Sequence, residues 1–250
     1  MSASAYDAIA EWYDTWIGGD SIARDPFFAA VQELLGDIRG LRICDLACGQ
    51  GKATRYLADQ GAHVAGVDVS ANMLEIARRY EASRPRGITY VQADVERPDA
   101  LAGEAFDGVL CTMALMDIPH LEPALRTVSR ILRPGGWFVF SIIHPCYNPA
   151  PSGEQVTEQG VVRTVSGYFT EGYWRSDTRP GPPGKVGSYH RMLSTYVNAL
   201  VAVGLTIERM AEPRLTGPHA ERRPVWMEVP GALVVRCRAA GSVASTGGIA

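Results

Sequence analysis

Three aspartates could be brought together for chemistry, because each follows a short stretch typical of a buried strand. Asp45 closes the segment that begins at Leu41, while Asp68 and Asp94 end the segments 63–68 and 88–94. In an open α/β sheet, ligands bind at the edge formed by the carboxyl ends of parallel strands. We therefore expect three carboxylates at one ligand-binding edge, where they favour positive charge and accept hydrogen bonds from hydroxyl and amino groups.

A glycine turn follows Asp45, since Gly49 and Gly51 lie between the first strand and a helix predicted over 52–58. Glycine lets a ligand approach the backbone, and the first N–H groups of the helix point at that ligand. Dinucleotide-binding turns carry G-x-G-x-x-G, but Thr54 stands in place of the third glycine. Asp45 would also repel a pyrophosphate, so the turn favours a nucleoside that carries positive charge.

The spacing of Asp68 fits the same kind of ligand. It lies 19 residues after Gly49 at a strand end, where nucleoside-binding folds place an acid that accepts from the ribose hydroxyls. Ser70 is the predicted cap of the helix 71–79 that follows.

Groups able to move a proton are few. His144 follows the predicted strand 137–143, and histidine titrates near neutral pH, so we predict that it is a base or a substrate-orienting group. A strand-end histidine bonded to backbone is the alternative. Asp117, after the fourth strand, is a candidate for binding a substrate amine, and His190 and Tyr168 are further candidates on the substrate side.

The elements that must position these residues alternate between strand and helix. The predicted fold class is α/β, a doubly wound, seven-stranded, mostly parallel sheet with one antiparallel strand near an edge. Expected strands cover 41–45, 63–68, 88–94, 106–113, 137–143, 205–210 and 232–237, and expected helices cover 6–16, 25–35, 52–58, 71–79, 121–132 and 189–203.

Five segments follow from this order. Residues 1–40 are predicted as lid helices, 41–146 as the cofactor-binding core, and 147–188 as a cap insertion over the active site. The cap is rich in Gly, Pro and aromatics, and Val161–Val165 could pair with Tyr168-Phe169 in a hairpin. Residues 189–238 complete the sheet, and 239–250 form a Gly/Ser-rich tail predicted to be disordered.

Four motifs resemble those of class I S-adenosylmethionine (SAM)-dependent methyltransferases. The stretch 45–51 resembles the D-x-x-C/G-G-x-G turn, and 68–73 resembles D-x-S-x-x-M/L. Leu132-Arg133-Pro134-Gly135-Gly136 is similar to the motif before the fifth strand, and the Y-D-x-x-A-x-x-Y-D pattern from Tyr6 to Asp14 to the N-terminal helix of small-molecule members.

The resemblance implies SAM as cofactor and assigns roles to residues. Met73 would pack on the adenine, Asp94 and the N–H of Val95 would bind its polar edge, and Cys111 to Asp117 would face the methyl group. Tyr13 would border the cofactor. The cofactor-binding set is then Tyr13, Asp45, Ala47, Gly49, Gly51, Asp68, Val69, Met73, Asp94, Val95 and Cys111.

Composition limits the partners. The net charge of −3 offers no basic field for nucleic acid. No long apolar segment or signal peptide is evident, and five scattered cysteines suit a reducing compartment, so we predict a cytoplasmic protein without a membrane partner. Cys44 and Cys48 have no further ligands at metal-binding spacing, so no metal is expected. Monomer and homodimer both stay open.

The sequence therefore predicts methyl transfer from SAM to an O, N or C nucleophile of a small molecule. The aromatic residues of the cap favour an aromatic or apolar acceptor. Two alternatives are an NAD(P)-dependent oxidoreductase, which the missing third glycine and Asp45 oppose, and a non-catalytic SAM-binding regulatory module. A nucleic-acid methyltransferase is opposed by the acidic balance.

Overall fold

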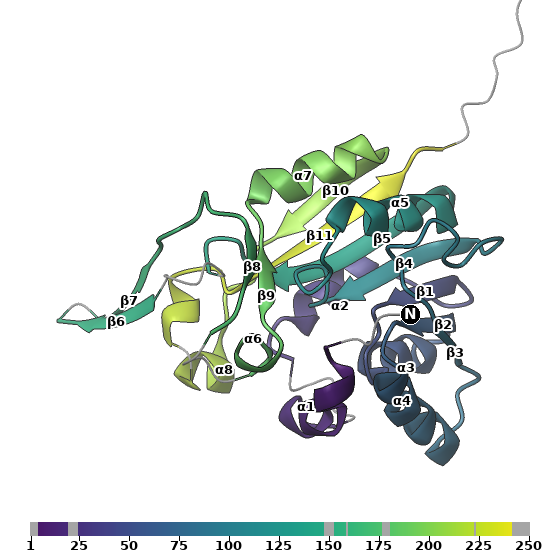
Figure 1. The fold of residues 1–250 in the computed structure, drawn as a ribbon, viewed down its shortest axis with the longest axis horizontal. Coiled ribbons are helices and arrows are strands. Elements are labelled where there is room, and N and C mark those ends of the chain that lie inside the picture. The colour runs from purple at the N-terminus through teal and green to yellow at the C-terminus, as the bar shows by residue number, and fades with distance from the viewer. Residues whose placement is uncertain are drawn as a thin grey trace, which may run out of the picture.

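A computed structural model of the chain describes residues 5–19, 25–147, 153–158, 160–176, 181–222 and 224–241. Its centre is a seven-stranded sheet in the order β10-β11-β5-β4-β1-β2-β3 (Figure 1). The strands are β1 (Arg42–Leu46), β2 (His63–Asp68), β3 (Thr89–Gln92), β4 (Phe106–Thr112), β5 (Leu132–Ile143), β10 (Leu205–Ala211) and β11 (Ala232–Ala239).

The predicted fold class is confirmed. Strands β1 to β5 pair in parallel, whereas β11 pairs antiparallel with both β5 and the edge strand β10. One antiparallel strand next to an edge is the arrangement expected from a helix followed by two consecutive strands.

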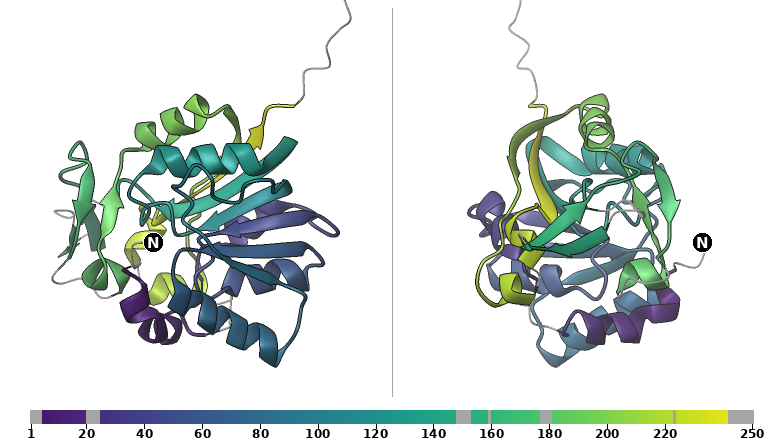
Figure 2. Two further views of the ribbon diagram at one scale, coloured as in Figure 1. Left: turned by 45° about the vertical axis from the view of Figure 1, so that its right-hand side comes forward. Right: turned by 90° about the vertical axis from the view of Figure 1, so that its left-hand side faces the viewer.

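Helices cover both faces of the sheet, because β1, β4 and β5 are apolar on both sides. Residues of α2 (Phe28–Leu35) and α3 (Lys52–Asp59) pack with Ile43, Leu110 and Val139. On the other face, α5 (Leu121–Ile131) and α7 (Leu193–Ala202) pack with Phe138 and Phe140. Figure 2 shows the sheet between the two helical layers. The core therefore fixes the positions of the strand ends.

The N-terminal segment forms a short 3₁₀ turn (Asp7–Ile9) and α1 (Ala10–Trp16), which packs on α4 (Ala71–Ser83). Ala10, Met73 and Ile76 are buried together there, with Tyr6, Tyr13 and Tyr80 around them. Ser70 caps α4 as predicted, since its Oγ accepts from the N–H of Met73.

The cap differs from the prediction in two places. The hairpin pairs β6 (Gly153–Thr157) with β7 (Gly160–Thr164), and Tyr168 and Phe169 lie in a turn outside it. A second antiparallel pair joins β8 (Gly172–Trp174) to β9 (Ser188–His190), so the expected helix start at residue 189 is wrong and α7 begins at Leu193. Pairing with a distant strand outweighs the local helical spacing of 189–192.

The cap also contains the short helix α6 (Pro182–Lys185). Between β10 and β11 lie the short helix α8 (Gly217–Arg222) and a 3₁₀ turn (Pro224–Met227). These elements lie beyond the arrowheads of β4 and β5 in Figure 1. The predicted strand 137–143 starts earlier, at Leu132, and the predicted helix 25–35 starts later, at Phe28. Of the predicted disordered tail, 242–250 lie outside the described residues.

Candidate functional site

The structure brings the three predicted carboxylates to one edge of the sheet. Asp45 lies in β1, Asp68 ends β2, and Asp94 follows β3 by two residues. These strands are neighbours and run parallel, so their carboxyl ends meet. Cys111, near the end of the adjacent strand β4, is fully buried beside them.

Asp45 is a buried carboxylate with one oxygen bonded and the other free of hydrogen bonds within the described residues. Its carboxylate is buried, and Oδ2 accepts from Thr54 Oγ1 at 2.5 Å. Its Oδ1 is buried and makes no hydrogen bond within the described residues. Burial raises the pKa of Asp45 to about 7, although the Thr54 bond lowers it. A cationic ligand would offset that burial.

The glycine turn leaves one side of its backbone open. Ala47, Gly49 and Gly51 all have positive φ, of 55°, 55° and 81°. A Cβ on Gly49 would meet nothing within 4 Å, whereas a Cβ on Gly51 would lie 2.4 Å from the hydroxyl oxygen of Tyr90. Gly49 therefore borders free space at the carboxylate edge, while Gly51 is pressed against the fold.

Asp68 ties this turn to the start of α4. One oxygen accepts from the N–H of Gly49 and the other from the N–H of Ser70, both at 2.8 Å. Two backbone donors fix the plane of the carboxylate, and each oxygen keeps a second lone pair for a ligand hydroxyl. Burial is the main cause that raises the pKa of Asp68, and the two backbone bonds lower it.

The predicted adenine side is arranged around the next turn. Asp94 Oδ1 accepts from the N–H of Glu96 at 3.0 Å, and Val95 is buried. The half-buried Val69 accepts from Gln92 Nε2 through its carbonyl at 3.1 Å. Met73 is only 1% exposed and is covered by α1.

The N-terminal segment is bonded across this edge. Asp7 Oδ1 accepts from Ser70 Oγ at 2.6 Å, and the Tyr6 hydroxyl donates to Asp117 Oδ2 at 2.7 Å. Lys52 Nζ donates to the carbonyl of Ile17 at 2.6 Å. These bonds tie the segment to α4, to the end of β4 and to the start of α3.

Asp117 and Tyr13 therefore lie in a covered, acidic environment. Burial raises the pKa of Asp117 to about 7, and the bond from Tyr6 lowers it. The pKa of Tyr13 is raised by burial first and then by the charges of Asp117, Asp25 and Asp68. The ring of Tyr13 lies 5.3 Å from that of Tyr6, whose hydroxyl bonds Asp117, so Tyr13 and Asp117 flank the same tyrosine.

Two arginines that sequence reasoning missed support the site. Arg55 is fully buried behind the glycine turn and donates to the carbonyl and side-chain oxygens of Gln50 at 2.6 and 2.7 Å. Arg191 donates to the carbonyls of Leu115 and Ile118, in the loop after β4. The sequence predicts only that both arginines lie in helices, and arginine is rarely buried, so no pattern indicates their roles.

The substrate-side candidates form two groups. Tyr168 and His190 contact each other, since His190 Nε2 lies 2.8 Å from the Tyr168 carbonyl and the rings lie 5.7 Å apart. The Tyr168 hydroxyl accepts from the N–H of Leu193, so the pair fastens the cap to α7. His144 instead lies with Cys146 and Glu212, at 2.8 Å from each.

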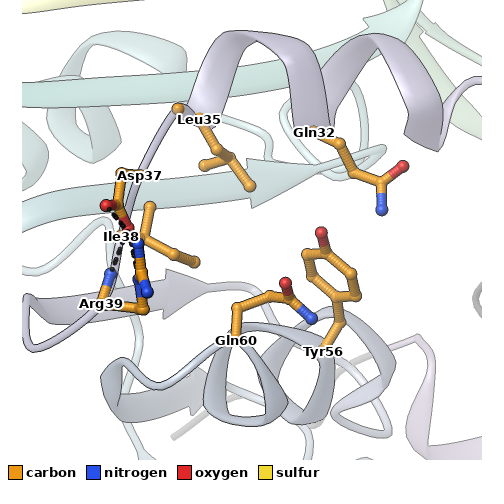
Figure 3. Close-up of a pocket in the computed structure, with 8 residues that line it drawn as sticks. Gln32, Leu35, Asp37, Ile38, Arg39, Tyr56 and Gln60 are labelled. Carbon is orange, nitrogen blue, oxygen red and sulfur yellow. Dashed lines mark hydrogen bonds and ion pairs between the residues drawn. The ribbon is translucent and has the colours of Figure 1, made fainter.

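A surface hollow of about 360 Å³ lies elsewhere, between α2 and α3 (Figure 3). None of the predicted site residues lines it, and its charged residues Asp37 and Arg39 bind each other. Within the described residues, no cluster of His, Cys, Asp or Glu could hold a metal ion. No helix in those same ranges is long and apolar enough to cross a bilayer.

The chain is similar to a known protein family and to a solved structure. Residues 44–140 match the methyltransferase domain family. A crystal structure of an S-adenosylmethionine-dependent methyltransferase from Mesorhizobium loti is 33% identical, with a TM-score of 0.74 over 85% of this chain and 97% of that one.

Two curated relatives match less than half of this chain. A ubiquinone biosynthesis O-methyltransferase of Bordetella avium is 31% identical over 114 residues, or 46% of this chain and 47% of the relative. A malonyl-[acyl-carrier protein] O-methyltransferase of Enterobacter lignolyticus is 39% identical over 105 residues, or 42% of this chain and 40% of the relative. The chain thus spans about half the length of these relatives or less.

Proposed function

Because the chain belongs to the family of S-adenosylmethionine-dependent methyltransferases, we propose that it transfers a methyl group from SAM to a nucleophile of a small molecule. The acceptor atom is O, N or C, and the acceptor is aromatic or apolar. Two relatives named as O-methyltransferases favour oxygen. The net charge of −3 and five free cysteines favour a small-molecule acceptor and a reducing compartment, the cytoplasm.

The observation that carries this proposal is the buried, unpartnered Oδ1 of Asp45 beside the open face of Gly49. SAM carries an ammonium and a sulfonium, which would compensate the carboxylate, and no phosphate that it would repel. Asp68 supplies acceptors for the ribose hydroxyls. A dinucleotide cofactor would instead place a pyrophosphate next to Asp45.

Bound SAM supplies a methyl group already activated on sulfur, so the chain has to orient the acceptor and exclude water. Tyr6 donates to Asp117, in the loop after β4, at 2.7 Å. Asp117, with a pKa raised to about 7, can bind an acceptor amine or hydroxyl and take its proton. His144 as the base stays a prediction, and each of its ring nitrogens has a protein partner.

Methyl transfer is tested by incubating the chain with SAM and a panel of phenols, amines and carboxylic acids, and measuring S-adenosylhomocysteine and products 14 Da heavier. We expect turnover with an aromatic or apolar acceptor. Asp117→Asn should lower kcat by roughly 100-fold, since it removes a proton acceptor, with SAM affinity changed less than threefold. Glu122→Gln, an exposed side chain of α5 paired with Arg126, is the control. SAM binding without turnover of any acceptor would favour the regulatory-module alternative.

Cofactor affinity should rise with pH. The pKa of Asp45 is raised to about 7 in the unliganded chain, and a cationic ligand favours the ionised form, so binding releases a proton below that pH. SAM affinity should therefore increase as pH rises from 5.5 to 7.5, by roughly tenfold for one proton released. Calorimetry in buffers of different ionisation enthalpy measures that proton.

Asp45→Asn is the matched variant for this measurement, because it keeps the side-chain size and removes the charge. We expect it to flatten the pH dependence and to weaken binding at pH 7.5. A wild-type affinity that falls over this pH range would contradict the role of Asp45.

A further inference from the structure

Three side chains near the end of β5, His144, Cys146 and Glu212, lie in contact with one another. His144 Nδ1 lies 2.8 Å from Cys146 Sγ, and His144 Nε2 lies 2.8 Å from Glu212 Oε1. Glu212 follows β10, so the contact joins segments 68 residues apart. The N–H of His144 also donates to the carbonyl of Gly231 at 3.1 Å, which fixes the backbone beneath the ring.

The neighbours of the imidazole determine which nitrogen carries its proton. The backbone N–H of Cys146 points at His144 Nδ1 at 3.2 Å, so Nδ1 is an acceptor. Nε2 then holds the proton and donates it to the Glu212 carboxylate. The thiol of Cys146 can then donate to Nδ1, which lies 2.8 Å away. The order carboxylate, imidazole, thiol is the one by which a base activates a nucleophile.

We propose that Cys146 is a nucleophilic thiol, activated by His144 and Glu212, that forms mixed disulfides with small disulfides. The thiol proton passes to His144 Nδ1 as Sγ attacks one sulfur of the reagent. The new S–S bond forms as the bond of the reagent breaks, and the departing thiolate takes the proton from His144. One disulfide and one thiol thus become another disulfide and another thiol, and no further oxidant is needed.

The surroundings of Cys146 keep its thiol neutral before the reaction and allow His144 to take the proton as the sulfur attacks. Burial raises the pKa of Cys146, as does the charge of Glu212, whereas Arg163 lowers it. Burial also lowers the pKa of His144, so the ring is a neutral base at pH 7, and the bond to Glu212 opposes that shift. Glu212, 55% exposed, can stabilise the imidazolium that forms.

Cys146 is accessible to a reagent to a degree that most of the other cysteines are not. It is half-buried, whereas Cys44, Cys111 and Cys237 are buried, and only Cys48 is comparable in exposure. The next residue, Tyr147, bonds Glu154 of the cap hairpin and stacks under the Arg163 guanidinium at 3.9 Å. Cys146 is therefore one residue away from a side chain held by the cap hairpin.

The test treats the full chain, without SAM or acceptor, with 4,4′-dithiodipyridine and follows thiopyridone release, with peptide mass mapping of the modified cysteine. We expect Cys146 to react fastest and Cys146→Ser to abolish the fast phase. His144→Gln should slow that phase roughly 100-fold and Glu212→Gln at least about tenfold. Glu228→Gln, in an exposed pair with Arg214, should leave the rate unchanged.

The proposal is overturned if Cys146 reacts no faster than Cys48 in the wild-type chain, or if Glu212→Gln behaves as Glu228→Gln does. In a variant that fails to fold, all five cysteines are exposed and react at one rate, so such a variant is recognised. The comparison of Cys146 with Cys48 in the wild-type chain then decides. Failure of this test leaves SAM binding untouched, because neither cofactor nor acceptor takes part.

Discussion

Replacement of Asp68 by alanine should weaken SAM binding by roughly 100-fold or more, or about 3 kcal/mol. Two losses contribute to this effect. The ribose hydroxyls lose a charged acceptor, and the N–H groups of Gly49 and Ser70 lose the carboxylate that orients them. Isothermal titration calorimetry with SAM measures the affinity directly.

Asp68→Asn is the informative companion variant, because its NH₂ group would face one of the two backbone donors and cannot accept from it. We expect it to bind SAM nearly as weakly as the alanine variant does. Asp99→Ala, which removes an exposed carboxylate paired with Arg97, is the matched control and should bind as the wild type does. An unchanged affinity in Asp68→Ala would mean that Asp68 does not hold the ribose.

Gly51→Ala and Gly49→Ala should distinguish a glycine needed for stability from a glycine needed for ligand binding. At Gly51 the new Cβ has positive φ and lies 2.4 Å from the Tyr90 hydroxyl oxygen, so we expect a loss of roughly 2–4 kcal/mol in the free energy of unfolding. At Gly49 only the backbone strain counts, about 1–2 kcal/mol, because nothing lies within 4 Å. Urea denaturation measures both.

Of the two variants, Gly49→Ala should lose less stability but more affinity for SAM. Gly49→Ala fills the open side of the turn and should weaken SAM binding at least about tenfold in the folded chain, since a ligand there needs the bare backbone. The neighbouring Ala47 already carries a Cβ at a φ of 55°, so the turn tolerates that conformation. Normal SAM affinity in Gly49→Ala would show that the ligand does not approach this face.

Regular strands and helices of the core could be predicted because local signals agreed with the tertiary structure. Ile43, Val67 and Val109 lie in short, largely apolar segments, typical of buried parallel strands. Ser70 gave a start signal for α4 that the structure confirms. Gly204 has a positive φ of 77° where α7 is followed by β10.

The cap could not be predicted in the same way. Tyr173 and Tyr189 are partners in a two-stranded sheet, with 15 residues between them. The helical spacing of Met192, Leu193 and Tyr196 instead predicts a helix that extends back to residue 189 and includes His190. The strand forms because β9 pairs with β8, and the N–H of Tyr189 also bonds the carbonyl of Met116, far away in sequence.

Some residues of the site could be predicted from the sequence, and others could not. Carboxylates at strand ends follow from the topology, so Asp45, Asp68 and Asp94 could be predicted to converge. Arg55 and Glu212 could not, because their roles depend on which surfaces meet: Arg55 lies over the ring of Tyr80 at 4.2 Å, and Glu212 reaches His144 across the sheet. No spacing rule predicts such contacts.

The most direct test of the central claim is a titration of the unaltered chain with SAM, S-adenosylhomocysteine and NAD at pH 7.5. If the acidic edge is built for a cationic nucleoside, SAM and S-adenosylhomocysteine bind with one-to-one stoichiometry and NAD does not bind. Tight binding of NAD without binding of SAM would contradict the assignment of this edge.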